Sequence, residues 1–180
     1  DPNPLMIGQQ FRLSVAVALA CYDFFSRYAG DETAIKWPND IYWRDRKAAG
    51  ILLENVIRGV DWKWCIAGIG INVNQTSFAI DGKNPVSLKQ ITGKQFDIVL
   101  MAKELCEKLE ARYQELRNGK QEALLLAYNN VLYKKNQPVK LKKGNANFYC
   151  TIDKVAINGC LEVKNAAQDS FDFGEIEWVL

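Results

Sequence analysis

Residues 34–54 read A-I-K-W-P-N-D-I-Y-W-R-D-R-K-A-A-G-I-L-L-E, and residues 62–74 read W-K-W-C-I-A-G-I-G-I-N-V-N. Both stretches are rich in apolar residues, yet they also concentrate glycine, asparagine and lysine. Core strands with such groups typically line a small-molecule site, because a flat ligand needs close backbone approach and a few fixed polar contacts. We therefore expect the remaining chain to be a scaffold for these two stretches.

Turn residues divide the two stretches into extended segments. Residues 34–37 form a short strand that ends at Pro38, and Asn39 and Asp40 provide turn chemistry. Residues 41–43 resume the extended structure, and residues 44–47 form a charged turn. A longer strand over 48–57 and a further strand over 62–74 follow. Together they predict an antiparallel meander.

The last of these strands has two very different faces. With a period of two residues, Ala67, Ile69, Ile71 and Val73 share one face, which is apolar and should pack on helices. The other face carries Ile66, Gly68, Gly70, Asn72 and Asn74. Such a face suits a planar ring lying against the backbone. Alternatively, the two glycines admit a neighbouring aromatic side chain such as Trp62 or Trp64.

Amphipathic helices and a β segment surround the meander. Apolar residues recur at steps of three and four over 8–28, 97–116 and 120–132, which predicts three helices. A polar loop over 76–93 contains a short helix after Ser87. The chain alternates from residue 134 onward. We predict an α+β fold, with residues 1–133 as one domain and residues 134–180 as a small β domain packed on it.

The composition excludes several classes of function. Apolar residues make up 48% of the 180 residues, enough for a core, and the net charge of +2 argues against a dedicated nucleic-acid surface. No apolar run reaches the length of about 20 residues that a membrane span needs. The chain contains no histidine, which rules out Ser-His-Asp and Cys-His catalysis. We interpret the five scattered cysteines (Cys21, Cys65, Cys106, Cys150 and Cys160) as reduced, buried thiols of a cytoplasmic protein.

The two stretches, in this order, closely resemble those of the biotin protein ligases. The resemblance extends over the predicted helices and the C-terminal β segment, hence nearly the whole chain. It implies a mixed or antiparallel sheet flanked by helices, as in class II synthetases, with a small C-terminal all-β barrel. It also implies ATP-dependent activation of biotin as biotinyl-5′-AMP, with Mg²⁺. The biotin then passes to a lysine of a carboxylase carrier domain.

The resemblance also implies roles for individual residues. Lys47 matches the family's catalytic lysine, which bridges the biotin carboxylate and the α-phosphate, and is counted with biotin binding. Gly50 and Ile51 match the strand against which the biotin rings lie. The ATP-binding positions are Asn39, Asp40, Gly70 and Asn72, although Asn39 and Asp40 can instead serve the turn. We interpret Lys36 as structural or as a support for the residues that contact the ligands. Strict alternation puts Lys47 on the face opposite Gly50, so a turn or a bulge must redirect it.

The family carries a Gly-Arg-Gly loop and an earlier strand upstream of the first helix, and this sequence begins after them. We therefore expect the chain to be the C-terminal part of a ligase, with weak ligand binding of its own. Two alternatives remain open. One is a lipoate or octanoyl transferase on the same fold, and the other is a non-catalytic binding module. The resemblance further implies a possible homodimer through sheet edges, without a membrane or nucleic-acid partner for this chain.

Overall fold

The computed structural model describes residues 2, 5–79 and 84–179. The first part of the chain contains helix η1 (Ile7–Gln9), α1 (Gln10–Ala29) and the strands β1 (Thr33–Lys36), β2 (Asp40–Trp43), β3 (Arg46–Arg58) and β4 (Asp61–Ile71). Three helices follow, α2 (Leu88–Thr92), α3 (Ile98–Arg117) and α4 (Gln121–Asn130). The last part contains β5 (Pro138–Lys143), β6 (Ala146–Val155), β7 (Leu161–Lys164), β8 (Ser170–Phe171) and β9 (Glu177–Trp178).

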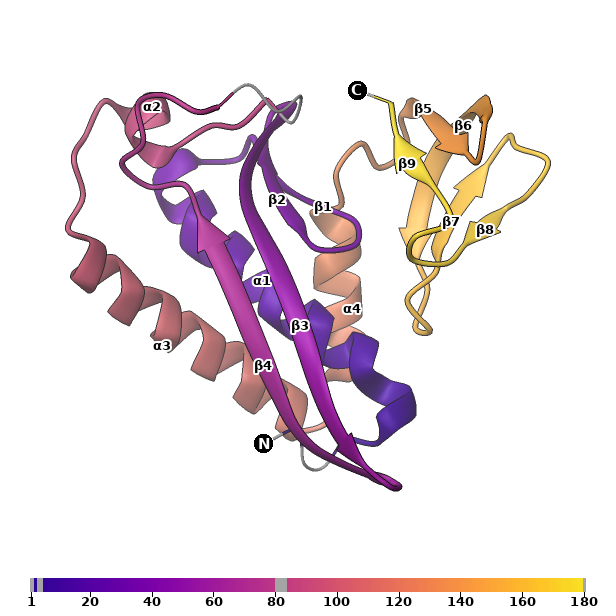
Figure 1. Ribbon diagram of the computed structural model, residues 1–180, viewed down its shortest axis with the longest axis horizontal. Helices are drawn as coiled ribbons and strands as arrows, with labels where there is room; N and C mark the ends of the chain where they lie inside the picture. The colour runs from indigo at the N-terminus through magenta and orange to yellow at the C-terminus, as the bar shows by residue number, and fades with distance from the viewer. Residues whose placement is uncertain (1, 3–4, 80–83, 180) are drawn as a thin grey trace.

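The first four strands form one antiparallel sheet in the order β1-β2-β3-β4, which confirms the predicted meander. Helix α1 crosses one face of this sheet, and β3 and β4 pass in front of it in Figure 1. Ile35, Ile41 and Ile51 are buried on that inner face and belong to the same core cluster as the apolar side of α1. We call the opposite face, which carries Gly50 and Gly70, the outer face.

The helix predictions are confirmed to within a few residues. Asp97 caps α3, since its Oδ1 accepts hydrogen bonds from the backbone N–H groups of Val99 and Leu100. The two long helices are joined by Arg112, which donates to both carboxylate oxygens of Asp23 at 2.7 and 3.1 Å. This bidentate geometry fixes the position of α3 on α1. No helix in the described part of the chain is long and apolar enough to cross a membrane.

The C-terminal strands form a second antiparallel sheet in the order β8-β7-β6-β5-β9, beside α4 and the β1–β2 hairpin (Figure 1). The buried Asn129 of α4 ties it down: its Nδ2 donates to Val155 O at 2.9 Å, and its Oδ1 accepts from Val155 N at 2.7 Å. The Trp37 indole N–H also donates to Gly159 O at 2.9 Å. The strand content of 134–180 is confirmed, while the barrel closure and the division into two domains stay predictions.

Three details differ from the sequence predictions. β4 ends at Ile71, and beyond it the carbonyls of Asn72 and Val73 accept from the first N–H groups of α2, while Asn72 N still donates to Ala48 O. Ala67 is exposed, because α1 does not cover this part of the inner face, whereas Ile69 and Val73 pack on the core. All five cysteines are free, but only Cys21 and Cys150 are buried and Cys106 is exposed.

Candidate functional site

A bulge in β3 places Lys47 over Gly50. Ile41 pairs with Ala49 and Tyr42 pairs with Lys47, so Ala48 is the extra residue between the two pairs. A bulge reverses the alternation of side chains beyond it. Lys47 therefore shares the outer face with Gly50, and a Cβ atom added to Gly50 would lie 3.3 Å from both Lys47 Cε and Nζ. The bulge resolves the difficulty that strict alternation raises.

Four residues lie in one row across the outer face, because their Cα atoms are register partners from strand to strand. Lys36 pairs with Asp40, Asp40 with Gly50, and Gly50 with Gly70. We call this set the site row. Lys47 Nζ lies 2.5 Å from Asp40 Oδ1, above the middle of the row. The row thus carries charged groups at one end and bare backbone at the other.

The Lys47–Asp40 ion pair is largely shielded from water, with side-chain exposures of 26% and 17%. A partly buried ion pair is screened less by salt than an exposed one. The Lys47 ammonium and Asp40 Oδ1 lie over Gly50 on the outer face, 3.3 and 3.5 Å from the position of a Cβ on that glycine. An incoming anion can therefore reach Lys47 by displacing Asp40.

The backbone of Lys47 is held on both sides. Its N–H donates to Asn84 O, and its carbonyl accepts from Val86 N at 2.9 Å and from Asn72 Nδ2 at 3.3 Å. Asn72 N also donates to Ala48 O at 2.9 Å. Asn72 therefore supports the bulge directly, which fixes the lysine before any ligand arrives.

A cavity of about 280 Å³ opens at the glycine end of the row. Its walls include Lys47, Gly50, Gly70 and Asn72, together with Phe78 and Pro85 from the loop after β4. Among the residues that the structure describes, no neighbouring heavy atom lies within 4 Å of the position of a Cβ on Gly70. The face therefore stays open for a flat group, and neither Trp62 nor Trp64 fills it, since Trp64 is 60% exposed and Trp62 donates to Trp64 O.

Asn39 and Ile51 lie away from this cavity. Asn39 Nδ2 donates to Ile51 O at 2.7 Å, and Ile51 N donates to Asn39 O at 2.9 Å. Asn39 thus serves the turn after the cis Trp37–Pro38 bond, the alternative that the sequence left open for it. The Ile51 side chain is buried on the inner face. Both residues line a separate cavity of about 570 Å³ between α1, β3 and the loops of the C-terminal sheet.

Sequence reasoning missed the contribution of the C-terminal sheet to the outer face. Lys36 Nζ lies 4.9 Å from the centre of the Tyr42 ring and 5.2 Å from that of Trp178 in β9. Burial lowers the pKa of Lys36 to about 8, and Asp40 and Lys47 act on it in opposite directions. The sequence signal for this cluster was weak, since Lys36 and Trp178 are 142 positions apart in the chain (178 − 36) and nothing local joins them.

A sequence profile of the biotin/lipoate A/B protein ligase family matches residues 2–72. This segment contains α1, the bulge and the complete site row. Residues 2–72 are thus similar to that family. Lys47, Gly50 and Gly70 of the site therefore lie in the part of the chain that the profile matches.

Curated relatives show the same likeness, and solved structures show a similar fold. The chain is 36% identical over 107 residues to the Bifunctional ligase/repressor BirA of Bacillus spizizenii, covering 58% of this chain and 33% of that protein. It is 34% identical over 110 residues to the Biotin--[acetyl-CoA-carboxylase] ligase of Mycobacterium tuberculosis, covering 59% of this chain and 39% of that protein. The chain thus spans between a third and two fifths of the length of these two relatives.

The fold matches the biotin protein ligase of Aquifex aeolicus in complex with biotin and ATP with a TM-score of 0.76 and 20% identity. That match covers 93% of this chain and 70% of the other. The apo structure of the same ligase matches with a TM-score of 0.78 and 19% identity, covering 95% and 76%. The predicted fold class, a mixed α+β fold with antiparallel sheets and flanking helices, is therefore confirmed.

Proposed function

We propose that this chain forms part of an ATP-dependent biotin–carrier-protein ligase, with Lys47 as its catalytic residue. The observation that carries the proposal is the Lys47 ammonium, held by Asp40 above Gly50 in the site row. The curated relatives of known name and the family profile support the choice of biotin. The absence of histidine agrees with it, because this reaction needs charge neutralisation and positioning more than a proton shuttle.

In the first half-reaction, a biotin carboxylate oxygen attacks the α-phosphorus of ATP. A bond forms between that oxygen and the phosphorus, the bond to the bridging oxygen breaks, and pyrophosphate leaves with the electron pair. Both reactants are anions, so a cation between them removes their repulsion. We assign this task to Lys47, which exchanges Asp40 for the carboxylate and the α-phosphate when they bind.

In the second half-reaction, the amine of a carrier-domain lysine attacks the acyl carbon of biotinyl-5′-AMP. An amide bond forms, the bond between the acyl carbon and the phosphate oxygen breaks, AMP leaves with its electron pair, and the proton of the amine passes to water. Lys47 remains next to the departing phosphate, where its charge stabilises the leaving group. The partner is thus a carrier domain of a biotin-dependent carboxylase, whose lysine must reach the outer face above Gly50.

The two glycines leave space over the strands, and Asn72 holds the backbone of Lys47 in place. Gly50 leaves room for the Lys47 side chain over the row, and Gly70 leaves the backbone accessible to the biotin rings or the nucleoside. Asn72 fixes the Lys47 carbonyl. Asn39 joins the start of β2 to β3 through its hydrogen bonds with the backbone of Ile51, and the Ile51 side chain is buried on the inner face. We propose no direct ligand contact for either side chain.

Magnesium is proposed to arrive as Mg-ATP. Within residues 2, 5–79 and 84–179, no three histidine, cysteine or carboxylate side chains gather at one point. Mg²⁺ usually keeps several waters and binds one or two carboxylates together with the substrate phosphates. Asp40 is the carboxylate of the site row and fits that pattern once Lys47 has released it.

The test uses the full-length gene product that contains this chain. It is incubated with Mg-ATP, a carrier domain and either labelled biotin or labelled lipoate, and acyl-adenylate and carrier label are measured. We expect biotin transfer, and its loss in Lys47→Ala. Transfer of lipoate in preference to biotin would select the alternative transferase, and formation of no adenylate would refute catalysis. Light scattering on the same protein tests the expected homodimer.

A further inference from the structure

Tyr133, which follows α4, contacts two parts of the chain that border Lys47, yet the proposed reaction gives it no task. Its ring packs on Tyr42 with a centroid distance of 5.1 Å, and Tyr42 is the register partner of Lys47 beside the bulge. The Tyr133 hydroxyl donates to Asp45 Oδ1 at 2.6 Å. Asp45 stands two positions before Lys47. One side chain therefore reaches both the strand opposite Lys47 and the turn that leads into it.

The turn between β2 and β3 passes any movement on to Lys47, because it is short. Trp43 pairs with Arg46, so only Arg44 and Asp45 form the turn. A two-residue hairpin turn fixes the geometry of the strands on either side of it. A shift of Asp45 therefore moves the start of β3, and Lys47 with it.

The bulge at Ala48 needs support from outside the two strands, since a bulge interrupts the ladder of hydrogen bonds. On the β4 side, the backbone of Lys47 bonds to Asn84 O and Val86 N in the loop before α2. On the β2 side, the support comes from the ring and the hydroxyl of Tyr133. Lys47 is thus held between two segments that lie outside the meander.

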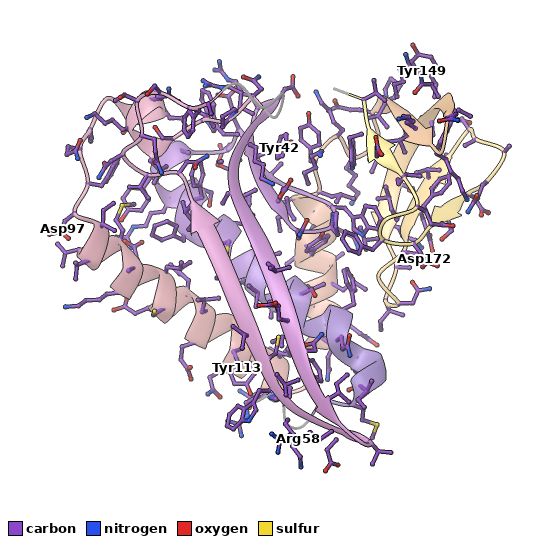
Figure 2. The ribbon with its side chains drawn as sticks, in the orientation of Figure 1. Tyr42, Arg58, Asp97, Tyr113, Tyr149 and Asp172 are labelled. Carbon is purple, nitrogen blue, oxygen red and sulfur yellow. The ribbon has the colours of Figure 1, made fainter. Side chains whose placement is uncertain are left out.

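Tyr133 is itself well fixed. The residue is only 4% exposed, and its backbone N–H donates to Ile35 O of β1 at 2.8 Å. Trp178 of β9 packs on the other part of its ring, with a centroid distance of 5.6 Å. Figure 2 shows Tyr42 on the side of β3 that faces the C-terminal sheet. Tyr133 is therefore anchored to β1 and to the C-terminal sheet, and it can hold the turn against both.

The hydrogen bond to the turn is charge-assisted. Lys134 Nζ lies 2.8 Å from the same Asp45 oxygen, and hydrogen bonds from Lys134 and Tyr133 lower the pKa of Asp45. Burial raises the pKa of the Tyr133 hydroxyl, which therefore keeps its proton. Hydrogen bonds to an ionised group are roughly twice as strong as those between neutral groups. The donor and the acceptor are thus in their bonding forms at neutral pH.

We propose that Tyr133 is a positioning residue for the reaction: by holding Tyr42 and Asp45 it keeps the Lys47 ammonium over Gly50, without touching a ligand itself. The proposal rests on the proposed function, in which Lys47 lies between the biotin carboxylate and the α-phosphate. A misplacement of about 1 Å in a reacting geometry can cost about a hundredfold in rate. Loss of the hydroxyl alone leaves the ring contact in place, so its effect is smaller.

A purely structural role for Tyr133 makes a different prediction, and Tyr28 supplies the comparison. The Tyr28 hydroxyl also donates to a carboxylate, that of Glu104 in α3, and its ring packs on Phe24 and Phe96. Tyr28→Phe therefore removes a similar bond between two helices. If Tyr133 only stabilises the fold, Tyr133→Phe behaves like Tyr28→Phe and leaves the rate of the folded protein unchanged.

The experiment measures single-turnover formation of biotinyl-5′-AMP by the full-length gene product that contains this chain. Biotin is varied at saturating Mg-ATP, at a temperature where circular dichroism shows every variant folded. We expect Tyr133→Phe to lower the maximal rate roughly five- to tenfold, and to change the half-saturating biotin concentration less than about twofold. Tyr28→Phe should change neither quantity.

A second variant approaches the same bond from the turn. Asp45→Ala removes the acceptor and should lower the maximal rate at least as much as Tyr133→Phe does. The double variant should be no slower than Asp45→Ala, because both substitutions break one hydrogen bond and their effects cannot add. A double variant that is slower by the product of the two single effects contradicts an action through Asp45.

The remaining outcomes separate the two proposals. An unchanged maximal rate in Tyr133→Phe, or an equal loss in Tyr28→Phe, overturns the role of Tyr133 and leaves the proposed function intact. If the parent activates lipoate instead of biotin, the same variants are compared with lipoate, so the role of Tyr133 is still decided. A parent that forms no acyl-adenylate refutes the proposed function, and the role of Tyr133 falls with it.

Discussion

Asn129 offers a direct test of how the C-terminal sheet is held on the rest of the protein. Its side chain is buried in α4, and it bonds both the N–H and the carbonyl of Val155 in β6. Truncation to alanine leaves these two backbone groups without partners, and an unsatisfied buried polar group costs about 1–3 kcal/mol. Partial relaxation and the better helix propensity of alanine offset some of this loss. We expect Asn129→Ala to lower the free energy of unfolding by about 2–4 kcal/mol.

The neighbouring residue supplies the control. Asn130 is exposed on the same helix, so Asn130→Ala gives a similar gain in helix propensity without removing a buried hydrogen bond. Urea unfolding followed by tryptophan fluorescence and circular dichroism gives both free energies by linear extrapolation. We expect Asn130→Ala to differ from the parent by less than about 0.5 kcal/mol. If the two variants unfold at the same urea concentration, the Asn129–Val155 contact does not hold the sheet.

Three further predictions concern the site and the surface chemistry. Gly50→Ala should displace the Lys47 ammonium, because the new Cβ would lie 3.3 Å from Nζ. We expect the rate of biotin transfer to fall about tenfold, with little change in the free energy of unfolding. A transfer rate equal to that of the parent contradicts this. Burial raises the pKa of the Cys21 thiol to about 12, so a thiol reagent at pH 8 should label the exposed Cys106 and spare Cys21 until the protein unfolds, as mass spectrometry can show. Hydrogen bonds from Lys134 and Tyr133 lower the pKa of Asp45 below its ordinary value of 3.8. The contribution of Asp45 to stability is therefore present above pH 3.8 and is lost as the pH falls further. Asp45→Asn should destabilise the protein at pH 7 and weaken the dependence of the free energy of unfolding on pH at acid pH.

The sequence determined the elements of the fold because their signals are local. A three- and four-residue repeat of apolar side chains is sufficient for α1 and α3, and turn residues between alternating runs are sufficient for the meander. The bare face of β4 also follows from its two glycines, since a period of two residues assigns every side chain to a face. Motif resemblance then singled out Lys47.

The tertiary structure alone decided which of these groups meet. The pairing of β2 with β3 placed the bulge at Ala48 and thereby brought Lys47 over Gly50, which local alternation puts on opposite faces. The fold also pairs the Asn39 amide with the carbonyl of Ile51, so that Asn39 does not lie at the outer-face site. It also brought Trp178 next to Lys36, although the two residues are 142 positions apart in the chain (178 − 36). Register and long-range packing depend on which surfaces the whole core can bury together, and no short stretch of sequence contains that information.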